Sequence, residues 1–378
     1  MIGTAFVQGV GTSSFGRQPG VGAPLLAQQA VGEALADAGV DDVRDIDAVF
    51  AGTVFGAPGT AQRMLQLLGV TGVPVLTFEN ACATSTTALH EARQSVLSGR
   101  FERVLCLGVE TMTLHFAGPI TPEHTDAEGR AGLALPGVYA MVASRYEHLY
   151  GLEPKALAAV AVKNRRHGAL NPRAQHGAEV TAEQVLASRM VADPLTLLQC
   201  CDISDAATAA VIGRGRGVDR DVPIAASALR SGELWDHRST HPWGYELMAR
   251  VAGEAWHEAG IGPGDVDLFE VHDAFTIGEI TATEALGIAE PGGGGDLVLS
   301  GHTALGGRQP VNPSGGLLSR GHPLGATGLA QIAEAVWQLR GEAGQRQVEG
   351  ARIAAVETMG GGTAGIDGNG CVVVVLGG

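Results

Sequence analysis

Cys82 stands between an apolar run and a helical pattern, within Asn-Ala-Cys-Ala-Thr-Ser at 80–85. The apolar run ends near Phe78 and the helical pattern begins near Thr84, so we expect Cys82 on a strand-to-helix turn. Unpaired N–H groups and the helix dipole at a helix N-terminus favour a thiolate. A thiolate attacks thioesters, and the N–H groups can hold the oxyanion. A small buried cysteine would give the same local pattern.

Two histidines occur in turn-like contexts. His322 lies in Gly-His-Pro-Leu-Gly-Ala-Thr-Gly at 321–328, and His272 lies in Val-His-Asp-Ala-Phe at 271–275. His322 can take a thiol proton and donate to a thioester oxygen. His272 follows a predicted strand, at the edge where open α/β sheets bind ligands, and can orient water or donate to an oxyanion. Both fit equally a structural role in which the ring bonds to the backbone.

Two further segments can bind negative charge. The three glycines at 360–362 follow a predicted strand and allow backbone N–H groups to approach an anion or a carbonyl oxygen. Lys163, Arg165 and Arg166 form a basic run that can contact an anionic cofactor tail. A solvated helix face explains this run equally well.

The elements that must position these residues alternate between strand and helix. Apolar runs predict strands at 5–11, 48–54, 73–78, 103–109, 222–226, 267–272, 352–357 and 371–376. Helical periodicity predicts helices at 25–38, 60–68, 84–98, 152–166, 245–259, 276–286 and 329–339. This order predicts an α/β protein with a mainly parallel, buried sheet.

The two halves of the chain share sequence patterns in the same order. A helix that ends at Ala-Gly and is followed by Asp-x-Asp occurs at 27–47 and again at 247–267. Val-Glu-Thr-Met occurs at 109–112 and at 356–359. Such ordered repetition predicts an internal duplication.

The duplication predicts two domains, residues 1–221 and 222–378. Residues 113–199 have no counterpart of similar length in the second half. A structureless connection of that length is unusual in a compact protein. We therefore expect this segment to be an inserted cap over the site.

Composition limits the classes of partner. The net charge is −15, with 25 Lys and Arg against 40 Asp and Glu, which disfavours a nucleic-acid partner. Five cysteines without a Cys-x-x-Cys motif predict free thiols, no metal site and a reducing cytoplasm. Cys200 and Cys201 lie in an apolar run and are expected in the core. Residues 1–11 lack a basic leader, and no apolar stretch reaches the ~20 residues of a membrane span.

Taken together, these motifs resemble the thiolase superfamily, most closely the sterol-carrier-protein thiolases and related bacterial lipid-transfer thiolases. The resemblance covers nearly the whole chain. Its segments are NACATSTTAL at 80–89, GVETM at 108–112, VAVKNRRHGALNP at 160–172, PLTLLQCCDISDAATA at 194–209, VHDAF at 271–275 and GHPLGATG at 321–328.

The resemblance implies a duplicated five-layer αβαβα thiolase fold, a homodimer or dimer of dimers, and a place in lipid metabolism. It implies coenzyme A thioesters as substrates, with no permanently bound cofactor. Cys82 would carry the acyl group and His322 would activate it. The N–H groups of Cys82 and Gly360, with His322, would form oxyanion holes. His272 replaces the Asn of ordinary thiolases.

The chain departs from the family pattern at the second catalytic cysteine. Where other thiolases have Cys-x-Gly, the chain has Thr358, and where the sterol-carrier branch has His-Asp-Cys-Phe, it has Ala274. Cys371 matches a cysteine inside the last strand, so we predict that it is structural. Proton transfer at the α-carbon would then require a histidine, a tyrosine or water.

Three functions follow from this pattern. The first is acyl transfer or Claisen-type carbon–carbon chemistry on an acyl-CoA through a Cys82 acyl-enzyme. The second is a thiolase-fold aldolase or retro-aldolase that works with a small OB-fold/zinc-ribbon partner, with Tyr245 as acid/base. The third is a non-catalytic subunit that binds acyl-CoA.

Overall fold

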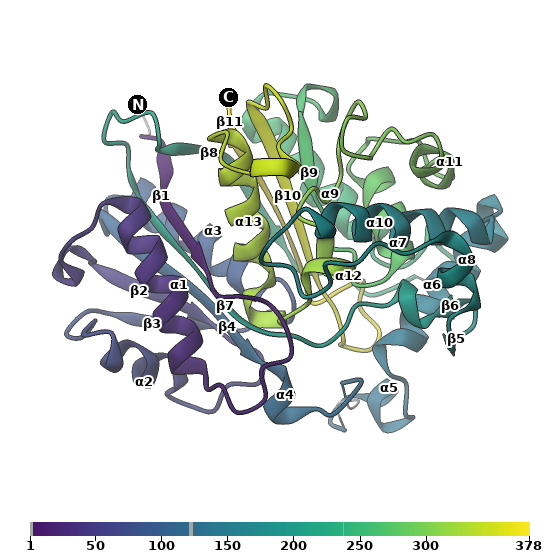
Figure 1. Ribbon diagram of the computed structural model, residues 1–378, viewed down its shortest axis with the longest axis horizontal. Helices are drawn as coiled ribbons and strands as arrows, with labels where there is room; N and C mark the ends of the chain where they lie inside the picture. The colour runs from purple at the N-terminus through teal and green to yellow at the C-terminus, as the bar shows by residue number, and fades with distance from the viewer. Residues whose placement is uncertain (1–2, 121–123, 237) are drawn as a thin grey trace.

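The computed structural model describes residues 3–120, 124–236 and 238–378. Nine strands of the described chain form one sheet in the order β3-β2-β4-β7-β1-β8-β11-β10-β9 (Figure 1). They are β1 (Ala5–Thr12), β2 (Ala48–Gly52), β3 (Val75–Phe78), β4 (Arg103–Thr111), β7 (Asp205–Arg214), β8 (Val222–Arg230), β9 (Leu268–Glu270), β10 (Ile353–Gly360) and β11 (Gly370–Gly377).

The sheet is mixed, so the prediction of a mainly parallel sheet was wrong. β2 pairs parallel with β3 and β4, and β10 pairs parallel with β9. The other ladders of the described sheet are antiparallel. β7, which no apolar run predicted, separates β4 from β1. It is rich in alanine, which has low strand propensity, and it is buried because helices approach closely on both faces.

Five layers are present, as predicted. The pairing of β1 with β8 joins the half-sheet β3-β2-β4-β7-β1 to the half-sheet β8-β11-β10-β9. One apolar core lies between the half-sheets and contains α3 (Thr84–Leu97) and α13 (Thr327–Leu339). A second core packs α1 (Ala23–Ala38) and α2 (Thr60–Leu67) on one outer face. A third packs α9 (Tyr245–Ala259) and α10 (Thr276–Ala285) on the other.

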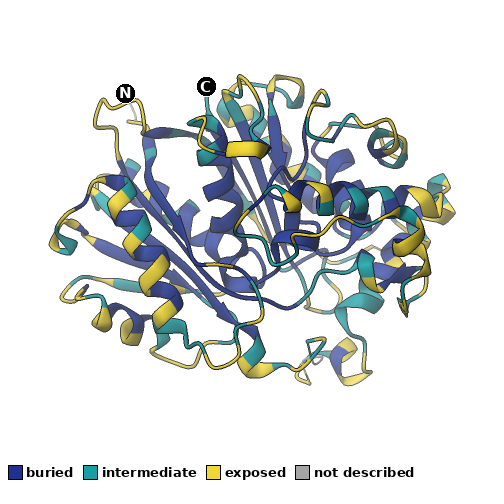
Figure 2. Ribbon diagram, in the orientation of Figure 1, coloured by how far each residue is buried: buried dark blue, intermediate teal, exposed yellow. Residues whose placement is uncertain are grey.

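Burial follows the layers. Most strands of the large sheet and the central helices α3 and α13 are largely buried, whereas the edge strand β3 is partly exposed and α1 and α9 keep an exposed stripe (Figure 2). Small residues allow the layers to approach closely: a Cβ added to Gly108 would lie 2.5 Å from the carbonyl oxygen of Gly325. The middle layer therefore holds the N-termini of α3 and α13 in fixed positions.

The predicted duplication is visible in the hydrogen bonds. The carboxylate of Asp47, just before β2, accepts a hydrogen bond from the backbone N–H of Arg103 at the start of β4 (2.8 Å). The carboxylate of Asp267, just before β9, accepts a hydrogen bond from the N–H of Ile353 at the start of β10 (3.0 Å). The same carboxylate thus joins the equivalent pair of parallel strands in each half.

The segment predicted as a cap, 113–199, forms its own small core against the C-terminal half; its residues 121–123 lie outside the described residues. It contributes most of α4 (Met112–His115), then α5 (Ala127–Arg130), α6 (Leu135–Tyr150), α7 (Pro154–Ala169), α8 (Ala182–Ala187), β5 (Met190–Ala192) and β6 (Leu195–Thr196). α6 and α7 pack against α10 (Figure 1).

The remaining helices are α11 (Gly294–Leu299) and α12 (Gly316–Arg320). No described helix has the length and hydropathy needed to cross a bilayer.

Candidate active site

Cys82 lies on a tight turn immediately before α3, as the sequence predicted. Ala81 has a φ of 48°, a left-handed conformation that a non-glycine residue adopts only where its surroundings enforce it. The hydroxyl of Thr84 accepts a hydrogen bond from the N–H of Asn80 (2.8 Å) and donates one to the carbonyl of Ala81 (2.6 Å). These bonds close the turn that carries Cys82.

His322 faces Cys82 from the other half of the molecule. Its Nε2 lies 3.3 Å from Cys82 Sγ, and its Nδ1 lies 2.8 Å from the hydroxyl of Thr327. That hydroxyl donates its single proton to the carbonyl of Pro323 (3.0 Å), so it must accept from Nδ1–H. The neutral ring therefore presents the lone pair of Nε2 to the thiol, which is the tautomer that a general base requires.

Burial decides the charge state of this pair. The Cys82 thiol is buried, which raises its pKa to about 12, although the N–H groups of Cys82 and Gly361 act in the opposite direction. Burial also lowers the pKa of His322 well below its usual value. The expectation that the helix N-terminus would yield a resting thiolate was wrong, because desolvation outweighs the N–H groups. The resting pair is a neutral thiol and a neutral imidazole.

His272 completes the cluster. Its backbone N–H donates to the carboxylate of Glu357 (2.9 Å), and its ring centroid lies 5.0 Å from that of His322. Burial, with the charge of Arg320, lowers the pKa of His272 to about 3, so the ring is neutral. Its Nδ1 has no hydrogen-bond partner among the residues that the structure describes. Donor atoms of Cys82, His272 and His322 lie within 4.8 Å of one another, a spacing that could also hold a soft metal ion.

The glycine turn lies against the cysteine turn. Gly360 ends β10, where a Cβ would lie 2.3 Å from the carbonyl oxygen of Asn80. The N–H that lies against Cys82 Sγ is that of the next residue, Gly361. Thr358 stands at the position of the missing cysteine, is fully buried and donates to Gln331 (2.8 Å).

A cavity of about 900 Å³ opens beside Cys82, between Ala81 and Gly361. Its wall is largely apolar, with one face of α6 on one side and the glycine turn with Trp243 on another. The residues of α6 that line it are Leu135, Val138, Met141, Val142 and Arg145. The cavity has the size and apolar lining expected of a site for a small-molecule ligand.

The basic run does not line this cavity, which corrects the predicted cofactor contacts. Lys163 is buried, and its ammonium group pairs with Glu279 (2.9 Å). Arg165 is half-buried and Arg166 points outward to Glu179. The described cation that lines the cavity is Arg145, which the sequence did not single out.

Tyr245, the predicted acid/base, begins α9 and is not among the described residues that line the cavity beside Cys82. Its ring stacks on His241, with centroids 4.2 Å apart, and its pKa is raised by burial and by Glu284, Tyr150 and Glu290. The phenol and the second thiol that do act electrostatically on the cluster are Tyr139 and Cys201. Sequence reasoning missed Tyr139 because it did not predict α6, and it assigned Cys201 to the core because its neighbours are apolar.

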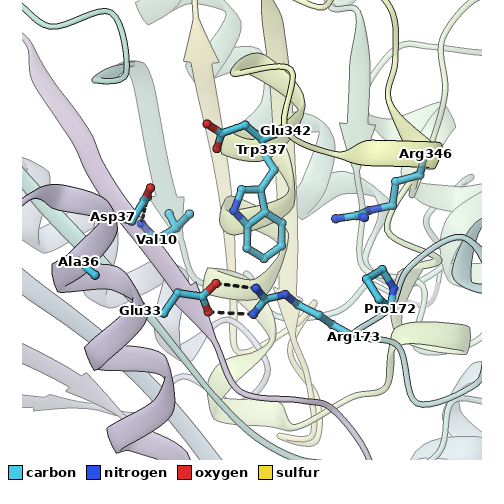
Figure 3. A pocket seen from close by; sticks show the side chains of 9 residues that line it. All are labelled: Val10, Glu33, Ala36, Asp37, Pro172, Arg173, Trp337, Glu342 and Arg346. Atoms are coloured by element: carbon cyan, nitrogen blue, oxygen red, sulfur yellow. Dashed lines mark hydrogen bonds and ion pairs between the residues drawn. The ribbon is translucent and has the colours of Figure 1, made fainter.

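A second cavity, of about 450 Å³, lies on α1 and α13 (Figure 3). Arg173 pairs with Glu33 there, and the guanidinium groups of Arg173 and Arg346 lie 4.9 and 5.8 Å from the ring centroid of Trp337. Arg346 also pairs with buried Glu334. Because these charges are neutralised within the protein, the cavity is a junction between the two halves and is the weaker candidate site.

Comparison with known proteins agrees with this geometry. The thiolase N-terminal domain model matches residues 6–215, and the thiolase C-terminal domain-like model matches residues 232–366. The chain is 41% identical to an acetyl-CoA acetyltransferase of Methanothermobacter thermautotrophicus, over 95% of this chain and 97% of that one. It is 37% identical to the benzoylsuccinyl-CoA thiolase subunit BbsB of Thauera aromatica, over 94% of each.

Among solved structures, the Ltp2-ChsH2(DUF35) aldolase superposes with a TM-score of 0.87 at 25% identity, covering 100% of this chain and 98% of that one. The chain belongs to the thiolase family. Its relatives support a thiolase-like acyltransferase that uses acyl-CoA.

Proposed function

We propose that the chain transfers acyl groups between thioesters, or makes and breaks a carbon–carbon bond next to one, through an acyl group carried on Cys82. The observation that supports this most is the contact between Cys82 Sγ and the unprotonated Nε2 of His322 (3.3 Å). Neither partner is charged at rest, so the thiol proton moves to Nε2 as sulfur attacks.

In the first half-reaction, Cys82 Sγ adds to the thioester carbonyl of an acyl-CoA. The oxyanion is held by the N–H groups of Cys82 and of the glycine turn, where Gly361 lies against the sulfur. The bond to the CoA sulfur then breaks, and CoA leaves with the proton that His322 holds. The acyl group remains on Cys82.

In the second half-reaction, a nucleophile takes the acyl group from Cys82. CoA thiolate returns it as a thioester, whereas the α-carbanion of a second acyl-CoA forms a carbon–carbon bond. His272 can donate a ring N–H to the thioester oxygen of that second molecule, because its ring lies beside His322 and its Nδ1 has no partner within the described parts of the chain. His322 first takes a proton from the thiol of the incoming CoA or from the α-carbon of the second acyl-CoA, and the Cys82 thiolate then receives that proton as the acyl group leaves.

The test is an intact-mass measurement on the purified chain after incubation with acetyl-, butyryl- and benzoyl-CoA. We expect a mass gain equal to the acyl group in the wild type and none in Cys82→Ala. Cys200→Ala, which removes a half-buried thiol packed against the core of the cap, is the matched control and should be labelled like the wild type. A protein that binds acyl-CoA but never gains mass would contradict the acyl-enzyme.

A second function is favoured by a specific observation. Thr358 and Ala274 stand at the two places where the family resemblance implies a second cysteine, and the solved structure that superposes with a TM-score of 0.87 is the Ltp2-ChsH2(DUF35) aldolase. An aldolase or retro-aldolase would release an aldehyde or ketone from a β-hydroxyacyl-CoA without acylating Cys82. Such release, undiminished in Cys82→Ala and dependent on an added OB-fold/zinc-ribbon partner, would replace the acyl-enzyme proposal.

A further inference from the structure

The three side chains that meet at the active site are the ligand types of a zinc site. Zn²⁺ in proteins is bound by thiolates and neutral imidazoles, and the donor atoms of Cys82, His272 and His322 all lie within 4.8 Å of one another. In a tetrahedral site, bonds of about 2.1 Å to nitrogen and about 2.3 Å to sulfur place these ligand atoms about 3.6 Å apart. Cys82 Sγ and His322 Nε2 are already 3.3 Å apart. The remaining donor atoms need to close by only about 1 Å to match that geometry.

His322 is prepared as a metal ligand by its own hydrogen bond. Its Nδ1–H donates to the hydroxyl of Thr327 (2.8 Å), which leaves a lone pair on Nε2 beside the sulfur. Histidines that bind metals usually donate the other ring N–H in this way, because the bond fixes both the tautomer and the orientation of the ring. The bond that prepares His322 to take a proton therefore prepares it equally to bind a cation.

His272 has a nitrogen without a task in the folded protein. The residue is 4% exposed, and its Nδ1 is buried with no hydrogen-bond partner among the described residues. Buried polar atoms normally have a partner, and one without is explained by a ligand, an ion or a water molecule. In the acyl transfer described above, His272 acts only once a second thioester is bound. Before that stage its ring is available to another ligand.

The charges around the cluster favour a cation. The carboxylate of Glu79 accepts the N–H of the residue before Cys82 (2.8 Å), and that of Glu357 accepts the N–H of His272 (2.9 Å). A divalent ion beside such carboxyl groups favours their ionised form. The opposing cation, Arg320, is paired with a buried glutamate (3.4 Å).

A metal ion has a route to the cluster and room for a fourth ligand. The cavity of about 900 Å³ reaches the turn of Ala81 and the glycine turn at Gly361, which lie on either side of Cys82. Three protein ligands complete a tetrahedron with one water molecule from this cavity, as in zinc sites that keep an open position.

We propose that Cys82, His272 and His322 bind one Zn²⁺ ion when no acyl group is present, and that the bound ion inhibits the reaction. The ion bonds to Cys82 Sγ, to His322 Nε2 and to a ring nitrogen of His272. The thiol releases its proton to solvent, because Nε2 is itself occupied by the metal. The nucleophile and its base are then both blocked, so Cys82 is not acylated. The inhibition rests on the proposed acyl-enzyme, whereas the binding does not.

The test of binding adds Co²⁺ to the chain after treatment with a chelator, without acyl-CoA. Co²⁺ takes Zn²⁺ sites and absorbs visible light, and a bond to sulfur adds a charge-transfer band. We expect one equivalent to bind with that band and Zn²⁺ to displace it. Cys82→Ala should lose the band, and His272→Asn should weaken binding at least about tenfold, the smallest loss expected even from an outer-shell partner.

Two variants outside the cluster are the matched controls. Cys200→Ala removes a half-buried thiol and His257→Asn removes an exposed histidine on α9, and both should bind Co²⁺ like the wild type. Circular dichroism checks that each variant is folded, and His322→Asn replaces His272→Asn if the latter is not. A wild type without the band, a band that persists in Cys82→Ala, or unchanged affinity in the histidine variant would overturn the site. Several ions bound equally by all variants would also overturn it, as adventitious binding.

The inhibition is tested by intact mass after incubation with acetyl-CoA. One equivalent of Zn²⁺ should abolish acetylation of Cys82, and a chelator should restore it. Undiminished acetylation of the zinc-loaded chain would overturn the inhibition. A chain that binds Co²⁺ at Cys82 but is never acylated would keep the metal site and remove the acyl-enzyme, and a chain that is acylated but shows no band would do the reverse.

Discussion

Helices α6 and α7 are neighbours in the cap, and they use polar residues in opposite ways. α7 carries the basic run that the sequence brings to attention, but its buried cation is neutralised inside the protein: Lys163 pairs with Glu279, and Asn164 donates to the same carboxylate (2.8 Å). α6 has an ordinary composition, yet its inner face lines the cavity with apolar side chains and with Arg145, and carries Tyr139 beside it.

The difference shows that charge density along a chain does not predict where a ligand binds. The guanidinium of Arg145 makes one hydrogen bond, to the carbonyl of Ser239 (2.7 Å), and no ion pair among the described residues. Its remaining N–H groups are available to an anionic part of a thioester. On α7, Lys163 pairs with buried Glu279 and Arg166 points outward to Glu179, so α7 supports the cap while α6 forms a wall of the cavity.

The largest effect should come from Lys163→Met. The substitution leaves Glu279 buried without its cation, which typically costs about 3–5 kcal/mol. Chemical denaturation should show that loss in the free energy of unfolding. The double variant Lys163→Met with Glu279→Leu should recover part of the loss, because no charge remains buried. A single variant as stable as the wild type would contradict the structural role of α7.

An acid-dependent loss of stability should come from His167 on α7. Its Nδ1–H donates to the carbonyl of Asn312 (2.9 Å) and its Nε2 accepts the N–H of Leu305 (3.0 Å), so the buried ring must be neutral. Its pKa is lowered from 6.5 to about 3, chiefly by burial. Between these values the unfolded chain binds a proton that the folded chain does not, so stability falls as the pH drops below 6.5.

The measurement compares urea unfolding of the wild type and of His167→Gln. From pH 7 to pH 5, the stability advantage of the wild type should shrink by about 2 kcal/mol. Parallel pH profiles of the free energy of unfolding would show that His167 binds a proton as readily in the folded chain as in the unfolded one, and would contradict this prediction.

The smallest effect should come from Arg145→Gln on α6. Losing a charge-assisted bond to bound acyl-CoA should weaken binding about tenfold, with stability almost unchanged. Calorimetric titration of acetyl-CoA into the Cys82→Ala chain measures this without turnover. Arg166→Gln removes the same charge from α7 and should bind like its parent, because its contact with Glu179 is exposed. Equal losses in both variants would mean that only the overall charge matters.

Much of the fold could be predicted from local sequence. α9 matches its predicted range, and β1, β4 and α3 differ from theirs by a few residues. The repeated Asp-x-Asp correctly marked the duplication. β7 and α6 were missed for different reasons. β7 is an alanine-rich strand whose partners lie far away in sequence, and α6 lacks a simple apolar stripe because it faces both a core and a cavity.

For the site, local sequence predicted the cysteine turn and both histidines, which the structure brings together. It did not predict their ionisation. The helix N-terminus suggested a thiolate at Cys82, but the depth of burial, which depends on the opposite half-sheet and the cap, raises the pKa of the thiol to about 12. Local sequence also suggested Tyr245 as acid/base, although Tyr245 stacks on His241 and does not line the cavity.

The sequence by itself therefore determined the elements, the duplication and the reactive side chains, because propensities, turns and motifs are properties of neighbouring residues. Only the tertiary structure decided which of those side chains meet, which charges are neutralised and which remain available. Distances between residues such as Cys82 and His322, 240 positions apart, and the desolvation of their surroundings depend on how whole layers pack.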